Sequence, residues 1–259
     1  MNFTQDQINQ IKDFYLNQNK SCNWIGNYFG CFHSTISSLL KKDNLLENKE
    51  IRLKKYKRKI NENFFEKIDT EEKAYWLGFL YADGNVSNEK QKNLQICLSS
   101  EDKEHLLKFS EDIESEYSVG EYNYKSEVVQ LRIPNEKIVN DLINCGCFPR
   151  KTFILKAPSK EIVPDSLKRH FIRGYFDGDG CKSKTHLIFL GTENLLNWIS
   201  KELPIEHKTK VIKPNGKNIY RFGLSVSSLE RDKKIYDYFY KDSKIFLERK
   251  RVKFLSAFA

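Results

Sequence analysis

The sequence predicts an α+β fold, with two pseudo-symmetric αββαββα repeats preceded by a small all-α domain. Three observations predict it. A helical segment that ends in an acid and a glycine occurs twice, at residues 75–84 and 171–180. The same order of strand-like and helical segments follows each copy, and the first 45 residues have helical patterning only. A motif duplicated together with its surroundings indicates a duplicated structural unit.

Residues 1–45 are expected to form three helices, at 5–17, 22–29 and 34–42. Thr4 suits the N-cap of the first helix, and Gly30 suits the end of the second. The spacing is typical of a helix-turn-helix, whose last helix presents polar side chains to a DNA major groove. A plain three-helix unit that binds protein is the alternative. The residues assigned to DNA contact on this helix are Ser34, Ser37, Ser38 and Lys41.

Residues 46–69 are expected to form a basic linker, with the densest run of Lys and Arg at 49–60. Such a run can lie along DNA phosphates, where it adds affinity without reading sequence. A solvated helix face or a hinge is the alternative interpretation.

The first repeat is assigned to residues 70–155. Its motif helix is followed by strands at 85–90 and 93–100, a helix at 101–114, strands at 117–125 and 127–133, and a helix at 135–144 that stops at Gly146. The second repeat, 156–259, has strands at 182–184 and 186–190, a helix at 193–203, strands at 208–213 and 218–226, and a helix at 231–239. Asn215-Gly216 between the last two strands is a hairpin signal, since both residues tolerate positive φ.

Small residues recur four apart in each copy of the motif, and each position in the second copy lies 96 residues after its counterpart. The set is Gly78 and Ala82, then Gly174 and Gly178. Residues four apart share one helix face, so these faces allow another backbone to approach closely. We expect the two motif helices to pack against each other.

Each motif helix is expected to carry an acid, Asp83 or Asp179, in its last turn and to end at a glycine in the left-handed region. A carboxylate there faces the negative pole of the helix dipole, which costs about 0.3–1 kcal/mol. Pairing the helices brings two such carboxylates together. Bound cations relieve this arrangement, and oxygen-rich sites with two acids suit magnesium.

Residues 76–84 and 172–180 fill the nine positions of the motif of the LAGLIDADG homing endonucleases, and the chain resembles this family over about 70–259. The resemblance implies that the motif helices pack at a pseudo-twofold axis and that a saddle of β-strands lies along the duplex. It implies Mg²⁺, with Mn²⁺ as a substitute, at Asp83 and Asp179 and the adjoining Gly84 and Gly180. Asp177 has no acidic counterpart, because Tyr81 stands at the matching position, and it is expected either to be structural or to support the metal ligands without binding the metal itself.

Two basic pairs follow the repeats at similar spacing. Lys151 lies 68 residues after Asp83, and Lys250 lies 71 after Asp179. These positions resemble the basic active-site residues of the family, and a cation there would stabilise developing negative charge. Solvated lysines are the alternative. Arg150 and Arg249 are assigned to phosphate or structural contacts.

Alternate polar residues on the predicted strands are the candidates for the DNA-binding face. In the first repeat and then the second they are Lys92, Gln95, Arg132, Lys182, Lys184, Lys208, Lys210, Lys217 and Arg221.

The composition indicates which kind of partner the protein binds and in which compartment it is expected. The 259 residues carry 44 Lys and Arg against 35 Asp and Glu, a formal charge of +9, which favours an anionic partner. The six cysteines have no zinc-finger spacing, so we expect reduced and mostly buried thiols. No signal peptide and no apolar run of about 18 residues is recognised, and the protein is expected to be intracellular, whether cytoplasmic, organellar or phage-encoded.

The sequence therefore favours a site-specific, double-strand DNA endonuclease of the homing type, a phosphodiester hydrolase of mobile elements such as introns. Both half-sites lie in one chain, so we expect a monomer with a long, asymmetric DNA target. A group I intron maturase, which would bind RNA, is one alternative. A transcription regulator that binds DNA without cleavage is another.

Overall fold

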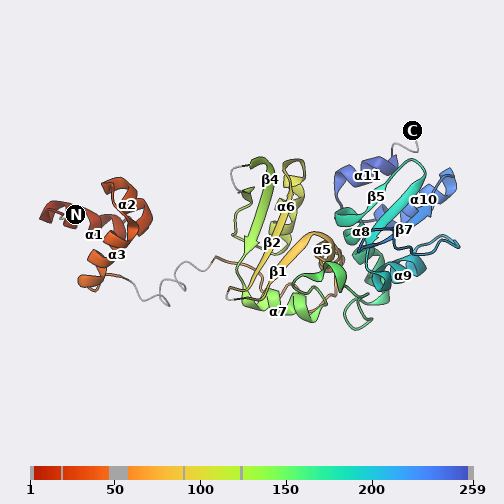
Figure 1. Ribbon diagram of the computed structural model, residues 1–259, viewed down its shortest axis with the longest axis horizontal. Helices are drawn as coiled ribbons and strands as arrows, with labels where there is room; N and C mark the ends of the chain where they lie inside the picture. The colour runs from red at the N-terminus through yellow and green to blue at the C-terminus, as the bar shows by residue number, and fades with distance from the viewer. Residues whose placement is uncertain (1–2, 19, 47–57, 90, 123–124, 256–259) are drawn as a thin grey trace. The chain divides into compact units, whose positions relative to one another are not determined.

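The computed structural model describes the chain except for residues 1–2, 19, 47–57, 90, 123–124 and 256–259. The side chains of 122 and 125–126 are also left undescribed. The chain divides into two compact units, Met1–Lys57 and Arg58–Ala259 (Figure 1). Most of the predicted basic run at 49–60 lies outside the described residues.

The first unit contains three helices as predicted. Thr4 caps the first helix: its hydroxyl accepts a hydrogen bond from the Gln7 backbone N–H, and the Gln7 side chain accepts one from the Thr4 backbone N–H. Gly30 ends the second helix with φ +67°, and Ile25, Ile36 and neighbouring apolar residues form a separate core. The helices are α1 (Gln5–Leu16), α2 (Cys22–Phe29) and α3 (His33–Lys42).

The second unit contains both repeats, and the first has a four-stranded antiparallel sheet in the order β1-β2-β4-β3. Buried residues alternate along its strands, so one face packs on helices and the other stays open. Its elements are α5 (Glu71–Asp83), β1 (Gly84–Ser87), β2 (Asn93–Ser99), the 3₁₀ turn η1 (Ser100–Asp102), α6 (Lys103–Asp112), β3 (Gly120–Tyr122), β4 (Lys125–Ile133) and α7 (Glu136–Asn144).

The second repeat has a three-stranded antiparallel sheet in the order β5-β6-β7. The strand predicted at 208–213 is wrong: only a single bridge joins Ile212 to Arg221, and Ile212 stays half exposed, so the segment has little apolar surface to bury. The 3₁₀ turns η2 (Lys151–Phe153) and η3 (Asp165–Leu167) lead into this repeat. Its elements are α8 (Lys168–Asp179), β5 (Cys181–Lys182), β6 (His186–Gly191), α9 (Glu193–Glu202), β7 (Tyr220–Ser225), α10 (Leu229–Tyr240) and α11 (Glu248–Leu255).

The turn before β7 departs from the predicted hairpin. Gly216 has φ +70°, but Asn215 is not in the left-handed region, and Lys217 N–H donates to Pro214 O. α11 was not predicted at all. Its Phe254 is buried against Phe176 of α8.

Helices α5 and α8 pack side by side between the two sheets (Figure 1). A Cβ at Gly78 would overlap the Phe171 carbonyl oxygen, and one at Gly174 would overlap the Tyr75 carbonyl oxygen. The reciprocal contacts confirm that the predicted small-residue faces meet. Glycine is needed at both positions because the obstacle is the opposite helix backbone.

The predicted linker ends earlier than residue 69. Phe64, Phe65 and Ile68 are buried in the core of the first repeat, and Asn61 N–H donates to Ile113 O. The boundary between the units falls after Lys57. These apolar residues, rather than the basic run before them, set where the second unit begins.

Candidate active site

Each motif helix ends at its acid, as predicted. The residue that follows is glycine, but for a different reason from the one predicted. Gly84 has φ −72° and Gly180 has φ −82°, both in the extended region rather than the left-handed one. A Cβ at Gly84 would lie 2.7 Å from Leu80 O, and one at Gly180 would lie 2.5 Å from Phe176 O. Close approach of the chain to its own helix end, not positive φ, therefore favours glycine.

Asp83 and Asp179 lie at the adjoining ends of α5 and α8. A Cβ on Gly178 would lie 3.3 Å from Asp83 Oδ2, so this carboxylate sits against the partner helix. Burial and the negative charge of Asp179 raise the pKa of Asp83 to about 6, and burial also raises the pKa of Asp179. The structure thus brings the two predicted acids into electrostatic contact.

Both predicted lysines reach the motif ends. Lys151 Nζ donates to Gly84 O, and Lys250 Nζ donates to Gly180 O. Their residues are 9% and 5% exposed, so the alternative of solvated lysines is wrong. Each carbonyl that follows a motif acid therefore already faces a cation, and the two halves repeat the same arrangement.

The residues at the helix ends suit a divalent cation. In the described part of the chain neither Asp83 nor Asp179 accepts a hydrogen bond or joins an ion pair, and no group of three or more His, Cys, Asp and Glu side chains gathers to hold a metal. Mg²⁺ needs no such cage, because it binds through one or two carboxylates and completes its shell with water and phosphate oxygens. The carbonyls of Gly84 and Gly180 add oxygen donors, since a carbonyl has two lone pairs.

The two arginines beside the lysines differ. Arg249 forms a bidentate ion pair with Asp102 of the first repeat, at 2.8 Å and 2.9 Å from Nε. Arg150 has φ +54° and an exposed side chain that lies 3.6 Å from Glu89. Arg249 is thus engaged in a structural contact, whereas Arg150 is free to contact a phosphate.

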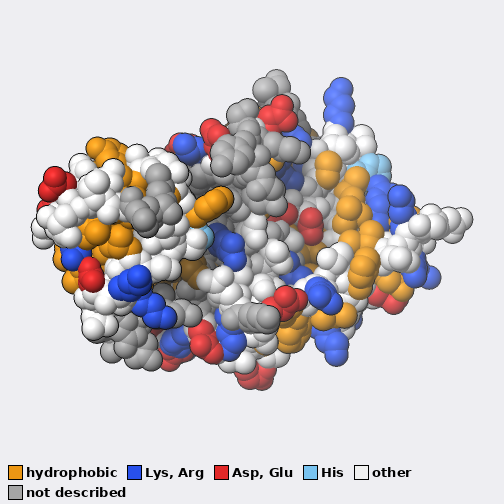
Figure 2. Space-filling model, turned by 60° about the vertical axis from the view of Figure 1, so that its left-hand side comes forward, with side chains coloured by type: hydrophobic (Ala, Val, Ile, Leu, Met, Phe, Trp, Pro, Cys, Tyr) orange, Lys and Arg blue, Asp and Glu red, His pale blue; other side chains and the backbone are white. Residues whose placement is uncertain are grey.

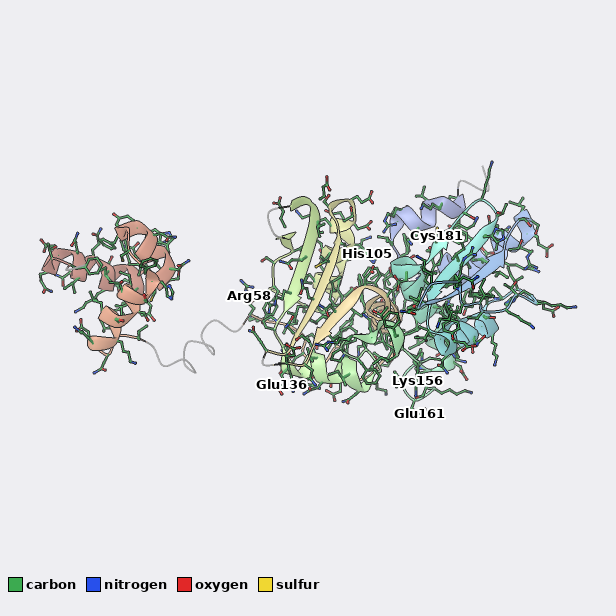
Figure 3. All side chains as sticks on the ribbon, in the orientation of Figure 1. Arg58, His105, Glu136, Lys156, Glu161 and Cys181 are labelled. Carbon is green, nitrogen blue, oxygen red and sulfur yellow. The ribbon has the colours of Figure 1, made fainter. Side chains whose placement is uncertain are left out.

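Asp177 lies at the centre of a buried hydrogen-bond network that the sequence did not predict. This buried carboxylate accepts hydrogen bonds from Tyr75 Oη (2.7 Å), Leu247 N (2.7 Å) and Tyr240 Oη (3.2 Å). Tyr75 Oη also meets Nε2 of His105, which extends from α6 between the repeats (Figure 3). Burial lowers the pKa of His105 to about 3, so its ring is neutral. A contact that joins four elements leaves no local sequence signal.

The open faces of the sheets carry some of the predicted DNA contacts. Gln95 lies opposite Arg132 across β2 and β4, and both point away from the core. Arg221 lies opposite Leu190 on β7, again on the open face. On the face shown in Figure 2, basic side chains are scattered among acidic ones rather than gathered in one patch. Lys184, Lys208, Lys210 and Lys217 are exposed but lie outside strands.

One predicted DNA contact is wrong, and a second already has partners within the protein. Lys182 is buried and pairs with Asp232 at 3.0 Å, because strand alternation places Cys181 on the open face and Lys182 on the inner one (Figure 3 labels Cys181). Lys92 pairs with Glu136 at 2.5 Å and reaches Asn140, both on α7, but its side chain remains 28% exposed, so its contact with DNA stays a prediction.

On α3 of the first unit, Ser34, Ser38 and Lys41 are exposed and Ser37 is partly buried. Their contact with DNA stays a prediction, as does the helix-turn-helix interpretation. None of the six cysteines forms a disulfide in the described structure, and only Cys145 and Cys147 are buried, fewer than expected. No helix in the described residues has the length and apolar character needed to cross a membrane.

Comparison with known proteins identifies the fold. No protein-family model matches the chain. A curated relative, the replication factor C small subunit of Methanocaldococcus jannaschii, is 29% identical over 175 residues, which are 64% of this chain and 9% of that protein. The chain thus spans less than a tenth of that relative.

Solved structures match much more completely. The I-SmaMI LAGLIDADG homing endonuclease bound to cleaved DNA aligns with a TM-score of 0.51 and 12% identity, over 74% of this chain and 88% of that one. Meganuclease I-SmaMI bound to uncleaveable DNA aligns with a TM-score of 0.51 and 10% identity, over 71% and 88%. The chain has the LAGLIDADG homing-endonuclease fold.

Proposed function

We propose that the chain is a divalent-metal-dependent DNA endonuclease that cuts both strands of a long, asymmetric site. One observation carries the proposal: two carboxylates that have no hydrogen-bond partner among the described residues lie at adjoining helix ends, and each is followed by a carbonyl that faces its own buried lysine. The likeness to an endonuclease solved on cleaved DNA supports the same reaction class.

The chemistry follows from the positions of these groups. A bound Mg²⁺ would act as a Lewis acid on a phosphate oxygen and lower the pKa of a bound water. Asp83 with the carbonyl of Gly84, and Asp179 with the carbonyl of Gly180, would each hold such an ion. Lys151 and Lys250 place an ammonium beside each acid, where a fixed positive charge stabilises the negative charge that develops at phosphorus.

We assign one half of the duplicated arrangement to each DNA strand. We take Asp83 with Lys151 and Asp179 with Lys250 as two similar sets, because each lysine donates to the carbonyl that follows that acid. Each acid also interacts electrostatically with the lysine of the other set. A single chain then carries both sets, so a monomer suffices for a double-strand break. Gln95, Arg132 and Arg221 on the open faces are the proposed contacts to the duplex, and α3 of the first unit is a further one.

The test begins with a random double-stranded DNA library incubated with the full chain and MgCl₂, from which cleaved sites are recovered and sequenced. We expect a defined site, and we expect Asp83→Asn or Asp179→Asn to abolish cutting while binding persists. Asp242→Asn is the matched control, because Asp242 is exposed with φ 57° and asparagine tolerates that conformation. Binding without cutting by the unaltered chain would favour a transcription regulator, and RNA splicing activity would favour a maturase.

A further inference from the structure

The segment that carries Lys250 is anchored to the opposite repeat. Arg249, the residue before it, forks onto Asp102, with Nη2 to Oδ2 at 2.8 Å in addition to the two Nε contacts. Asp102 belongs to η1 of the first repeat and its side chain is 5% exposed. A bidentate Arg–carboxylate pair fixes orientation as well as distance.

The same segment has two more anchors. Lys244 N–H donates to Glu71 Oε1 of α5 at 2.8 Å, and Leu247 N–H donates to Asp177 Oδ2 at 2.7 Å. Leu247 O in turn accepts from Lys250 N–H at the start of α11. The segment that leads to Lys250 is therefore held at three points, and two of its three anchors come from the first repeat.

The segment that carries Lys151 is held in a related way but by neutral groups. Thr192 Oγ1 donates to Leu155 O at 2.5 Å, and Asn194 Oδ1 accepts from Ala157 N–H at 2.9 Å. Both partners begin α9 of the second repeat, as Asp102 precedes α6 of the first. No bidentate ion pair holds this segment in the described structure, since Arg150 is 91% exposed and 3.6 Å from Glu89.

We propose that Asp102 is a positioning residue for Lys250: through Arg249 it sets the place of this lysine from the opposite repeat, so loss of Asp102 slows the cutting of one DNA strand. The inference rests on the proposed function. Its physical basis is that Lys250 must meet a phosphate within a few tenths of an ångström, and a displacement of about 1 Å costs about 100-fold in rate. Lys151 has its own anchors and keeps its place.

The experiment uses the full chain and the target recovered by the selection, with a different fluorophore on each 5′ end. Single-turnover rates are measured for the two strands separately. Lys250→Met identifies the strand that this lysine serves. Asp102→Ala should slow the same strand roughly 10- to 100-fold and leave the other within about twofold, so that nicked DNA accumulates.

Two further variants separate positioning from folding. Asp102→Glu keeps a carboxylate for Arg249 and should restore much of the lost rate. Glu89→Ala removes the acid beside the equivalent arginine, Arg150, and should change neither strand, because that pair is exposed. The unaffected strand also serves as an internal control, because a misfolded protein would cut neither.

The outcomes are distinct. Equal slowing of both strands by Asp102→Ala, or no slowing of either, overturns the positioning role while the proposed function stands. Selective loss of the strand that Lys151 serves overturns it as well. If the unaltered chain cuts neither strand of any site, the proposed function fails and this inference fails with it.

Discussion

The packing of α5 on α8 leads to a prediction about a pair of residues, Gly178 and Ala82. A Cβ on Gly178 would overlap the Cβ of Ala82, whereas a Cβ on Gly174 would overlap the Tyr75 carbonyl oxygen and lie 2.9 Å from Phe79 N. The first obstacle is a side-chain atom that a second substitution removes. The second obstacle is backbone, which no substitution removes.

The magnitudes follow from two opposing effects. Overpacking costs about 1–3 kcal/mol, and replacing glycine by alanine inside a helix returns up to about 1 kcal/mol. Gly178→Ala should therefore lower the free energy of unfolding by about 1 kcal/mol. Gly174→Ala should lower it by about 2 kcal/mol or more, because the helices must separate to admit the methyl group.

The assay is a double-mutant comparison. Urea unfolding is followed by tryptophan fluorescence with Trp24 replaced by phenylalanine, so that only Trp76 and Trp198 of the second unit report. Ala82→Gly combined with Gly178→Ala should be more stable than the sum of the single effects by about 1 kcal/mol. The same Ala82→Gly change should not rescue Gly174→Ala. Additive effects in the first pair, or rescue in the second, would refute this account of the interface.

Three further outcomes are expected. Burial and the charge of Asp179 raise the pKa of Asp83 to about 6 in the folded protein, so protonation of Asp83 stabilises the folded state. Without metal, the free energy of unfolding should therefore fall as pH rises from 4 to 7, and Asp83→Asn should reduce this fall by about 1–2 kcal/mol in denaturation series. Part of the slope should remain in that variant, because burial also raises the pKa of Asp177 to about 6. Tyr75→Phe should destabilise by about 2–3 kcal/mol in urea unfolding, because two buried partners lose their hydrogen bond. Lys182→Met should lower the free energy of unfolding by about 3–5 kcal/mol, because it leaves Asp232 unpaired, but the folded protein should bind DNA as before. Arg132→Ala should weaken DNA binding in gel-shift assays and leave the free energy of unfolding nearly unchanged.

The sequence was informative where a feature repeats or is local. The contact of Gly78 and Gly174 with the opposite helix could be predicted because the small residues repeat at a constant offset of 96 residues. The helix caps at Thr4 and Gly30 could be predicted because each depends on residues within one turn. The two lysines were also found by their matched spacing, although the sequence could not show that Lys151 and Lys250 are buried.

The sequence was uninformative about which face of a short strand a side chain occupies and about which distant residue it contacts. On a two-residue strand such as β5, a shift of one residue moves Lys182 from the open face to the core, and no alternation is long enough to decide. Asp102 and Arg249 lie 147 residues apart, so their pairing depends on how the repeats pack. The glycines after the acids suited two explanations, positive φ and close approach, which only backbone geometry separates.

The close packing that stabilises the pair of helices α5 and α8 also brings two carboxylates together at the helix ends, where they repel each other. Gly78 and Gly174 allow the backbones to touch, and this contact forces Asp83 toward Asp179, where the charge of one raises the pKa of the other. A cation between them removes that repulsion. Mg²⁺ should therefore raise the thermal unfolding temperature of the unaltered chain and do so much less for Asp83→Asn, which links occupancy of the site to stability without any DNA.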